Sequence, residues 1–135
     1  MKNLKLLLAT IAVVMLCASC DRASIKPVDL TCEYAAEPLI DIQNPRLAWI
    51  NTNIGGNGAA QSAYRIRVAL SPDGFETPVW DTGMVESSAS AFITYEGSPL
   101  KSRTSYWWQV MVWDEQGRAS AWSRPAQWHM GMLSP

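Results

Sequence analysis

The side chains that could carry out acid–base chemistry are spread along this chain rather than gathered. The chain has twelve Asp and Glu residues, and most of them fall in expected turns or beside them. Catalysis by paired carboxyl groups, as in the cleavage of a glycosidic bond, needs two of them roughly 5 to 10 Å apart around a cleft, with one kept protonated. No pair of acidic residues has a spacing that indicates such a cleft. The sequence therefore assigns no catalytic residue.

Histidine, serine and cysteine indicate no nucleophile and no metal site either. His129 is the only histidine, and no cysteine or second histidine stands at the spacing of metal ligands, so we interpret it as a strand residue near the C-terminus. The serines lack the sequence context of a nucleophile elbow. Cys32 is most simply a small buried apolar side chain of the first strand, with a reactive thiol as the alternative. The sequence thus predicts neither a metal nor another cofactor.

The sequence before Cys20 indicates a covalent modification of that residue. Two lysines precede residues 6–16, an apolar run broken by a single threonine, which is too short to span a bilayer but suits the core of a signal peptide. Ala18 and Ser19 then stand directly before Cys20, an arrangement similar to a bacterial lipobox, in which the thiol is acylated before the chain is cut in front of it. Because Cys17 stands where such motifs favour leucine, an ordinary secretory signal cut after Ala18 or Ser19 is the alternative.

Residues 1–19 are therefore predicted to be a lipoprotein signal peptide, and Cys20 the lipidation site. Several acyl chains together hold a protein durably on a membrane. We expect an exported lipoprotein of the bacterial cell envelope, at the outer membrane, on either its periplasmic or its surface face.

The remaining residues suffice for one compact domain and are too few for two. The formal net charge is −1, and basic and acidic residues are interleaved, so there is no basic stripe to bind nucleic acid. With Cys20 acylated, Cys32 has no partner for a disulfide. The domain must then be stabilised by apolar burial, for which seven Trp residues are available.

Short alternating runs separated by Pro, Gly, Asp and Ser predict an all-β domain over residues 28–133, after a short polar linker at 20–27. Seven strands are expected, at 28–34, 45–50, 61–70, 79–81, 89–95, 106–113 and 122–130. Strands of this number and length suit an antiparallel β-sandwich, with two sheets packed face to face.

Alternation is clearest in the strand expected at 61–70. Tyr64, Ile66, Val68 and Leu70 are expected to face the core, and Arg65, Arg67 and Ala69 to face out. Leu100 and Tyr106 stand six residues apart ahead of the longest strand, a spacing typical of a tyrosine corner, in which the phenol bonds to the backbone just upstream.

The outward face of the strand expected at 106–113 is unusually apolar. It carries Trp107, Gln109, Met111 and Trp113, and such a surface is not expected to stay in water. Two interpretations remain open. Another domain or a neighbouring loop covers this face, or the aromatic rings stack on sugar rings.

A second aromatic feature lies nearer the C-terminus. The run 119–123 is similar to half of the Trp-Ser repeat of cytokine-receptor modules, in which Trp stacks between Arg side chains. Arg65 and Arg67 could supply the cations, which would favour an adhesion or protein-interaction domain. The simpler interpretation is that Trp122 covers the edge of the sandwich.

Several short motifs follow one another along residues 28–133 in an order that is typical of one protein family. They are Leu30-Thr31-Cys32-Glu33-Tyr34, Pro45-Arg46-Leu47-Ala48-Trp49, Gln61-Ser62-Ala63-Tyr64-Arg65-Ile66, Val79-Trp80-Asp81-Thr82-Gly83, Tyr106-Trp107-Trp108-Gln109-Val110-Met111-Val112-Trp113-Asp114 and Ala121-Trp122-Ser123. As a set, over residues 28–133, they resemble the N-terminal fibronectin type III-like domain of bacterial α-L-rhamnosidases of glycoside hydrolase family 78.

The resemblance implies a fibronectin type III or immunoglobulin-like fold and a noncatalytic accessory role. In that family, hydrolysis of terminal α-L-rhamnosides belongs to a later helical barrel, and no position of this sequence matches one of its catalytic residues. We therefore expect the chain to stop before that barrel, as a fragment or a short relative, and to lack enzyme activity alone. The expected partners are the catalytic domain, contacted through Trp107, Met111 and Trp113, and the membrane. A rhamnose-containing glycan on the same residues is the alternative, and no nucleic acid is expected.

Overall fold

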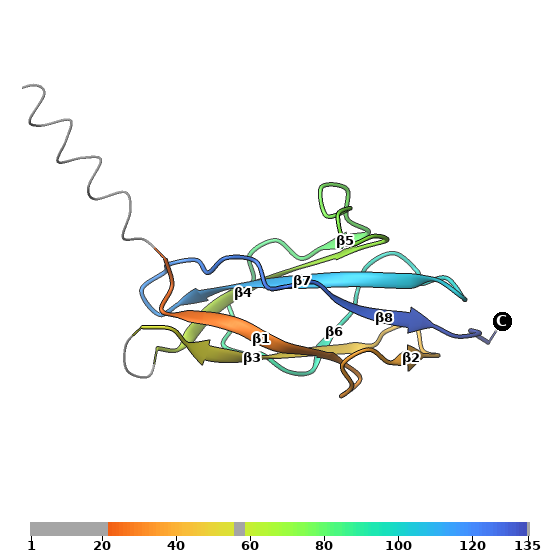
Figure 1. Ribbon diagram of the computed structural model, residues 1–135, viewed down its shortest axis with the longest axis horizontal. Coiled ribbons are helices and arrows are strands. Elements are labelled where there is room, and N and C mark those ends of the chain that lie inside the picture. The colour runs from red at the N-terminus through yellow and green to blue at the C-terminus, as the bar shows by residue number, and fades with distance from the viewer. Residues whose placement is uncertain (1–21, 56–58, 135) are drawn as a thin grey trace, which may run out of the picture.

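The computed structural model describes residues 22–55 and 59–134, so the expected signal peptide and Cys20 lie outside the described residues. Within these ranges the chain forms eight strands in two sheets, with one sheet packed over the other (Figure 1). None of the described residues forms a helix long and apolar enough to cross a membrane. The first and last described residues lie at opposite ends of the long axis (Figure 1). The predicted β-sandwich is thus confirmed.

The two sheets differ in size. The three-stranded sheet has the order β1-β3-β6, with β1 at Ile25–Cys32, β3 at Arg46–Asn53 and β6 at Ile93–Thr94. The five-stranded sheet has the order β2-β8-β7-β4-β5, with β2 at Leu39–Ile40, β8 at Ala126–Met130, β7 at Ser105–Asp114, β4 at Gln61–Ala69 and β5 at Trp80–Asp81. Every pair is antiparallel except β2 with β8, which is parallel.

The strand bounds differ from the expected ones where distant contacts decide them. β1 begins at Ile25 rather than at residue 28, because Ala23 and Ile25 are buried in the core. β2 was not expected, and its two residues are held by β8. β8 begins at Ala126 rather than at residue 122, because serine side chains in 120–123 occupy the hydrogen-bonding groups of β7 there.

One assignment in the strand expected at 61–70 was wrong, because Leu70, expected to face the core, is 57% exposed. Ala69 lies opposite Trp107 on the outer face and is buried there. The strand ends at Ala69, and the chain then turns at Ser71–Gly74, where the Gly74 N–H donates to the Ser71 carbonyl over 3.2 Å. Leaving the sheet at this point carries Leu70 away from the core.

The core fills the space between the sheets with large side chains from β3, β4, β7 and β8. The fully buried ones include Leu47, Ile66, Val68, Trp108, Val110, Val112 and Trp128. Trp128 stacks on Tyr106 with ring centroids 5.4 Å apart and meets Tyr95 edge-on at 6.1 Å. Aromatic pairs of this kind add to the stabilisation that comes from their buried area.

The predicted tyrosine corner is present. Leu100 and Tyr106 are both buried, and the Lys101 N–H donates to the Tyr106 hydroxyl over 3.0 Å. This bond joins the segment before β7 to the strand itself, which fixes the crossing between the sheets.

A buried carboxylate closes the far end of β7. Asp114 is fully buried and accepts hydrogen bonds from the N–H groups of Ser24 (3.3 Å), Gln116 (3.0 Å) and Arg118 (3.0 Å), and from Arg118 Nε (2.9 Å). Burial raises the pKa of the carboxyl, but these hydrogen bonds more than offset it, so the pKa lies below its ordinary value. The bond to Ser24 ties the start of β1 to the β7 hairpin and explains why β1 begins before residue 28.

Candidate functional site

The outer face of β7 is the surface that the sequence predicts to be functional. Alternate residues of β7 are buried, which leaves Trp107, Met111 and Trp113 pointing away from the core. All three are partly exposed, and Gln109 between them is only 8% exposed. The strand therefore places the predicted residues on one face, and something covers the middle of that face.

Trp122, from the chain itself, lies next to this face. Its backbone runs beside β7, because the Ser120 N–H donates to the Val112 carbonyl over 2.8 Å and the Ser123 N–H to the Val110 carbonyl over 2.9 Å. The hydroxyls of the same two serines accept from the Val112 and Val110 N–H groups, both over 3.0 Å.

The indole of Trp122 meets two arginine side chains. Its ring centroid lies 4.8 Å from Arg67 Cζ and 5.7 Å from Arg65 Cζ, and both arginines belong to β4, on the other side of β7. The arginine side chains and the ring thus meet over the outer face of β7, where Gln109 lies opposite Arg67. The arginines are placed over Trp122 as the sequence suggested.

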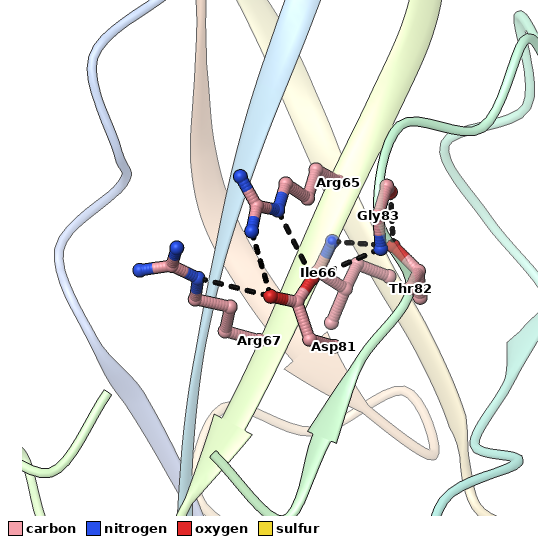
Figure 2. Close-up of polar contacts among 6 residues, drawn as sticks. All are labelled: Arg65, Ile66, Arg67, Asp81, Thr82 and Gly83. Carbon is pink, nitrogen blue, oxygen red and sulfur yellow. Dashed lines mark hydrogen bonds and ion pairs between the residues drawn. The ribbon is translucent and has the colours of Figure 1, made fainter. Parts of the chain in front are cut away.

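An acidic residue of β5 fixes both arginines (Figure 2). Arg65 binds the Asp81 carboxylate with two hydrogen bonds, of 3.0 and 2.7 Å, and Arg67 Nε lies 3.3 Å from the same carboxylate. The Gly83 N–H adds a fourth bond, of 2.9 Å. The hydrogen bonds from Arg65, outweighing partial burial, lower the pKa of Asp81 to about 2.

Asp81 is ionised at neutral pH and its oxygens are already engaged, so it cannot serve as the protonated acid of a hydrolase. Trp107 and Trp113 remain partly exposed at the two ends of the face, and Met111 is partly exposed between them. These three are the parts of the predicted surface that a partner can reach.

Sequence reasoning missed a chain of three polar residues. Ser105 Oγ lies 2.7 Å from His129 Nδ1, and His129 Nε2 lies 2.9 Å from Glu37 Oε1. The residue types match those of a hydrolytic triad, but Ser105 lies in a regular strand directly opposite His129, and the Glu37 side chain is 58% exposed. The contacts tie the segment before β2 to β7 and β8. Only the β7–β8 register could have revealed them, because the residues are far apart in sequence.

The remaining candidates are structural. Cys32 is 1% exposed, and its burial, with a smaller contribution from the charge of Glu33, raises the pKa of the thiol to about 12. The predicted buried apolar role of Cys32 is confirmed, as is the position of His129 in a strand. Over residues 22–55 and 59–134, no three His, Cys, Asp or Glu side chains are grouped so that they could hold a metal ion.

Comparison with known proteins identifies the family. The family described as Rha78A-like, N-terminal immunoglobulin domain matches residues 27–134. The chain belongs to this family. The match covers nearly the whole predicted domain, so the resemblance noted from the sequence motifs is confirmed.

Relatives of this Rha78A-like N-terminal domain include large enzymes. An α-L-rhamnosidase of Streptomyces avermitilis is 47% identical over 103 residues, which is 75% of this chain and 10% of that protein. An α-L-rhamnosidase of Formosa agariphila is 37% identical over 142 residues, covering 98% of this chain and 15% of that protein. The chain thus spans a small part of the relatives that it matches.

Solved structures of α-L-rhamnosidases contain a domain with the same fold. The crystal structure of Streptomyces avermitilis α-L-rhamnosidase complexed with L-rhamnose matches with a TM-score of 0.76 and 44% identity, over 79% of this chain and 10% of that one. The α-L-rhamnosidase from Dictyoglumus thermophilum matches with a TM-score of 0.71 and 35% identity, over 78% of this chain and 12% of that one. The Rha78A-like domain therefore has the fold of one small part of these enzymes.

Proposed function

We propose that the chain is a noncatalytic accessory module of an envelope-anchored α-L-rhamnosidase, and that other parts of the parent protein hydrolyse terminal α-L-rhamnosides. The observation that carries the proposal is the match of this whole domain to a tenth or so of proteins named α-L-rhamnosidase.

The enzyme assay that tests this proposal uses an aryl α-L-rhamnoside. The chain alone should release no nitrophenol above a heat-denatured control, whereas the Streptomyces avermitilis relative, assayed beside it, should hydrolyse the substrate. Turnover by the chain well above the denatured control would show that it carries its own active site.

In an accessory module, the outer face of β7 can contact another domain of the parent protein. We infer that Trp107, Met111 and Trp113 contact the catalytic domain of the parent protein, because apolar side chains that stay partly exposed in a row mark interaction surfaces. The fixed Arg65–Asp81 pair beside them offers charge to the polar rim of such an interface.

Substitution at both ends of this face tests the contact. Trp107→Ser combined with Trp113→Ser should lower the melting midpoint of the parent protein by more than it lowers that of the chain alone. Ile50→Ser, at an exposed residue of the other sheet, serves as the control and should act equally in both. Equal losses for the Trp pair in the chain and the parent would contradict the docking role.

Anchoring at the envelope is the second part of the proposal. The apolar run at 6–16 and the small residues before Cys20 support acylation of that thiol. Bacteria that express the chain with labelled palmitate should incorporate the label into the wild type and not into the Cys20→Ser variant. A labelled Cys20→Ser variant, or an unlabelled wild type, would contradict acylation at Cys20.

A further inference from the structure

An open groove lies between the outer strands of the two sheets, away from the outer face of β7. Its volume is about 540 Å³, and it runs between β5, the last strand of the five-stranded sheet, and β6, the last strand of the three-stranded sheet. The lining residues are Tyr64, Trp80, Asp81, Thr82, Val85, Phe92, Ile93, Thr94 and Glu96. This volume can hold one or two sugar rings.

One wall of the groove presents a row of exposed side chains. Phe92, Thr94 and Glu96 are all exposed, whereas the intervening Ile93 and Tyr95 turn toward the core. Alternate residues of an extended strand lie about 6 to 7 Å apart. An aromatic ring, a hydroxyl and a carboxylate are thus presented one after another along this wall of the groove.

These polar groups are free to bind a ligand, unlike those on the opposite wall. Asp81 is held by two arginines, and the Thr82 hydroxyl already donates to the Gly83 carbonyl over 2.7 Å. In contrast, neither Thr94 nor Glu96 makes a side-chain hydrogen bond or ion pair with any residue that the structure describes.

Phe92 is exposed although its backbone conformation is unfavourable. Phe92 has φ 59°, a left-handed conformation that bulky residues rarely adopt, yet its side chain is 65% exposed. Tyr34, which meets Phe92 edge-on at 6.1 Å, has φ 67° and is 67% exposed. Because both side chains are exposed, burial of apolar surface does not offset the unfavourable backbone conformation. Such conformations are concentrated at ligand sites.

We propose that the groove binds the end of a neutral glycan, with one sugar ring stacked on Phe92. The polarised C–H groups of the sugar lie against the electron-rich face of the ring, and Thr94 and Glu96 bond to its hydroxyl groups. A peptide strand suits the groove less well, because β5 and β6 have only two residues each and offer few ladder hydrogen bonds. The choice of a 6-deoxyhexose as the sugar rests on the proposed function, whereas the groove does not.

Titration with L-rhamnose, followed by amide NMR shifts of the chain, tests the proposal. Saturable shifts at residues 92–96 are expected, with a dissociation constant in the range of about 1 to 10 mM. Phe92→Ala should weaken binding about tenfold or more, and Glu96→Gln several-fold. Both substitutions are at exposed positions, so the variants should fold. Ile50→Ala, at an exposed residue of β3 outside the groove, is the matched control and should leave binding unchanged. Trp107→Ala tests the other aromatic surface.

Three results would overturn the proposal. One is the absence of saturable shifts at about 50 mM sugar. Another is binding that Trp107→Ala removes and Phe92→Ala preserves, which would place the sugar on the outer face of β7. The last is shifts at residues 92–96 that follow protein concentration and not sugar, which would make the groove a site of strand pairing between copies. None of these results bears on the nitrophenol assay, so the proposed function is tested independently.

Discussion

Replacing the buried carboxylate of Asp114 with an amide tests the account of how the domain is closed. In Asp114→Asn, one side-chain oxygen can still accept from the Gln116 and Arg118 N–H groups. The other oxygen becomes an NH₂ group that faces two donors, the Ser24 N–H and Arg118 Nε. The substitution therefore removes two hydrogen bonds to a charged group and leaves the shape of the side chain unchanged.

The expected loss follows from those two bonds. Hydrogen bonds to charged groups contribute about 1.5 to 3 kcal/mol each. Arg118 is partly exposed and can turn to water, which reduces its share of the loss. We expect the free energy of unfolding to fall by about 3 kcal/mol at pH 7, and the melting midpoint to fall by roughly 12 °C.

The loss should depend on pH with a defined sign. The folded-state pKa of Asp114 lies below its ordinary value of 3.8, so the stabilisation is fully present above that pH and is lost as the pH falls through the folded-state pKa. Thermal unfolding followed by circular dichroism at pH 7 and at stepwise lower pH measures both quantities. Asp73→Asn, in the exposed turn after β4, is the matched control and should change stability by less than about 0.5 kcal/mol.

Two outcomes would refute this reasoning. If Asp114→Asn and Asp73→Asn melt alike at pH 7, the bonds at Asp114 do not stabilise the fold. If the difference between wild type and Asp114→Asn stays constant as the pH is lowered through the folded-state pKa, the charge of the carboxylate is not its cause.

Two further predictions concern buried side chains. Tyr106→Phe should keep the stack on Trp128 but leave the Lys101 N–H without its partner, at a cost of about 1 kcal/mol in denaturant unfolding, and an unchanged midpoint would count against the tyrosine corner. Cys32, whose burial raises the pKa of the thiol to about 12, should resist iodoacetamide at pH 8 in the folded chain and react once urea is added, as mass spectrometry of its peptide would report. Equal labelling with and without urea would contradict its burial.

The sequence predicted those features that local patterns determine. Alternation in β4 and β7 identifies their buried faces, because period-two spacing follows from strand geometry alone. The six-residue spacing of Leu100 and Tyr106 likewise predicts the tyrosine corner, because the bond spans only a few residues. The same alternation of apolar and polar residues predicted the all-β fold class and the outward position of Trp107 and Trp113.

Features that depend on distant partners could not be predicted. Ile25 begins β1 because the neighbouring Ser24 is bonded to Asp114, 90 residues away. The two residues of β2 carry no strand pattern of their own and are held by β8. Around Trp122 the local sequence favours a strand, yet the hydroxyls of Ser120 and Ser123 accept from the β7 backbone there. Tertiary context outweighs local propensity at each of these places.

The opposite placement of the two chain ends has a geometric consequence for an anchored protein (Figure 1). If Cys20 is acylated, as proposed, the bilayer would lie near the pole where β1 starts, and any polypeptide that follows residue 134 would leave from the other pole. β7 has ten residues, so at about 3.3 Å per residue the sandwich would separate the two by roughly 30 Å. The domain would then act as a spacer between the lipid surface and the proposed catalytic domain.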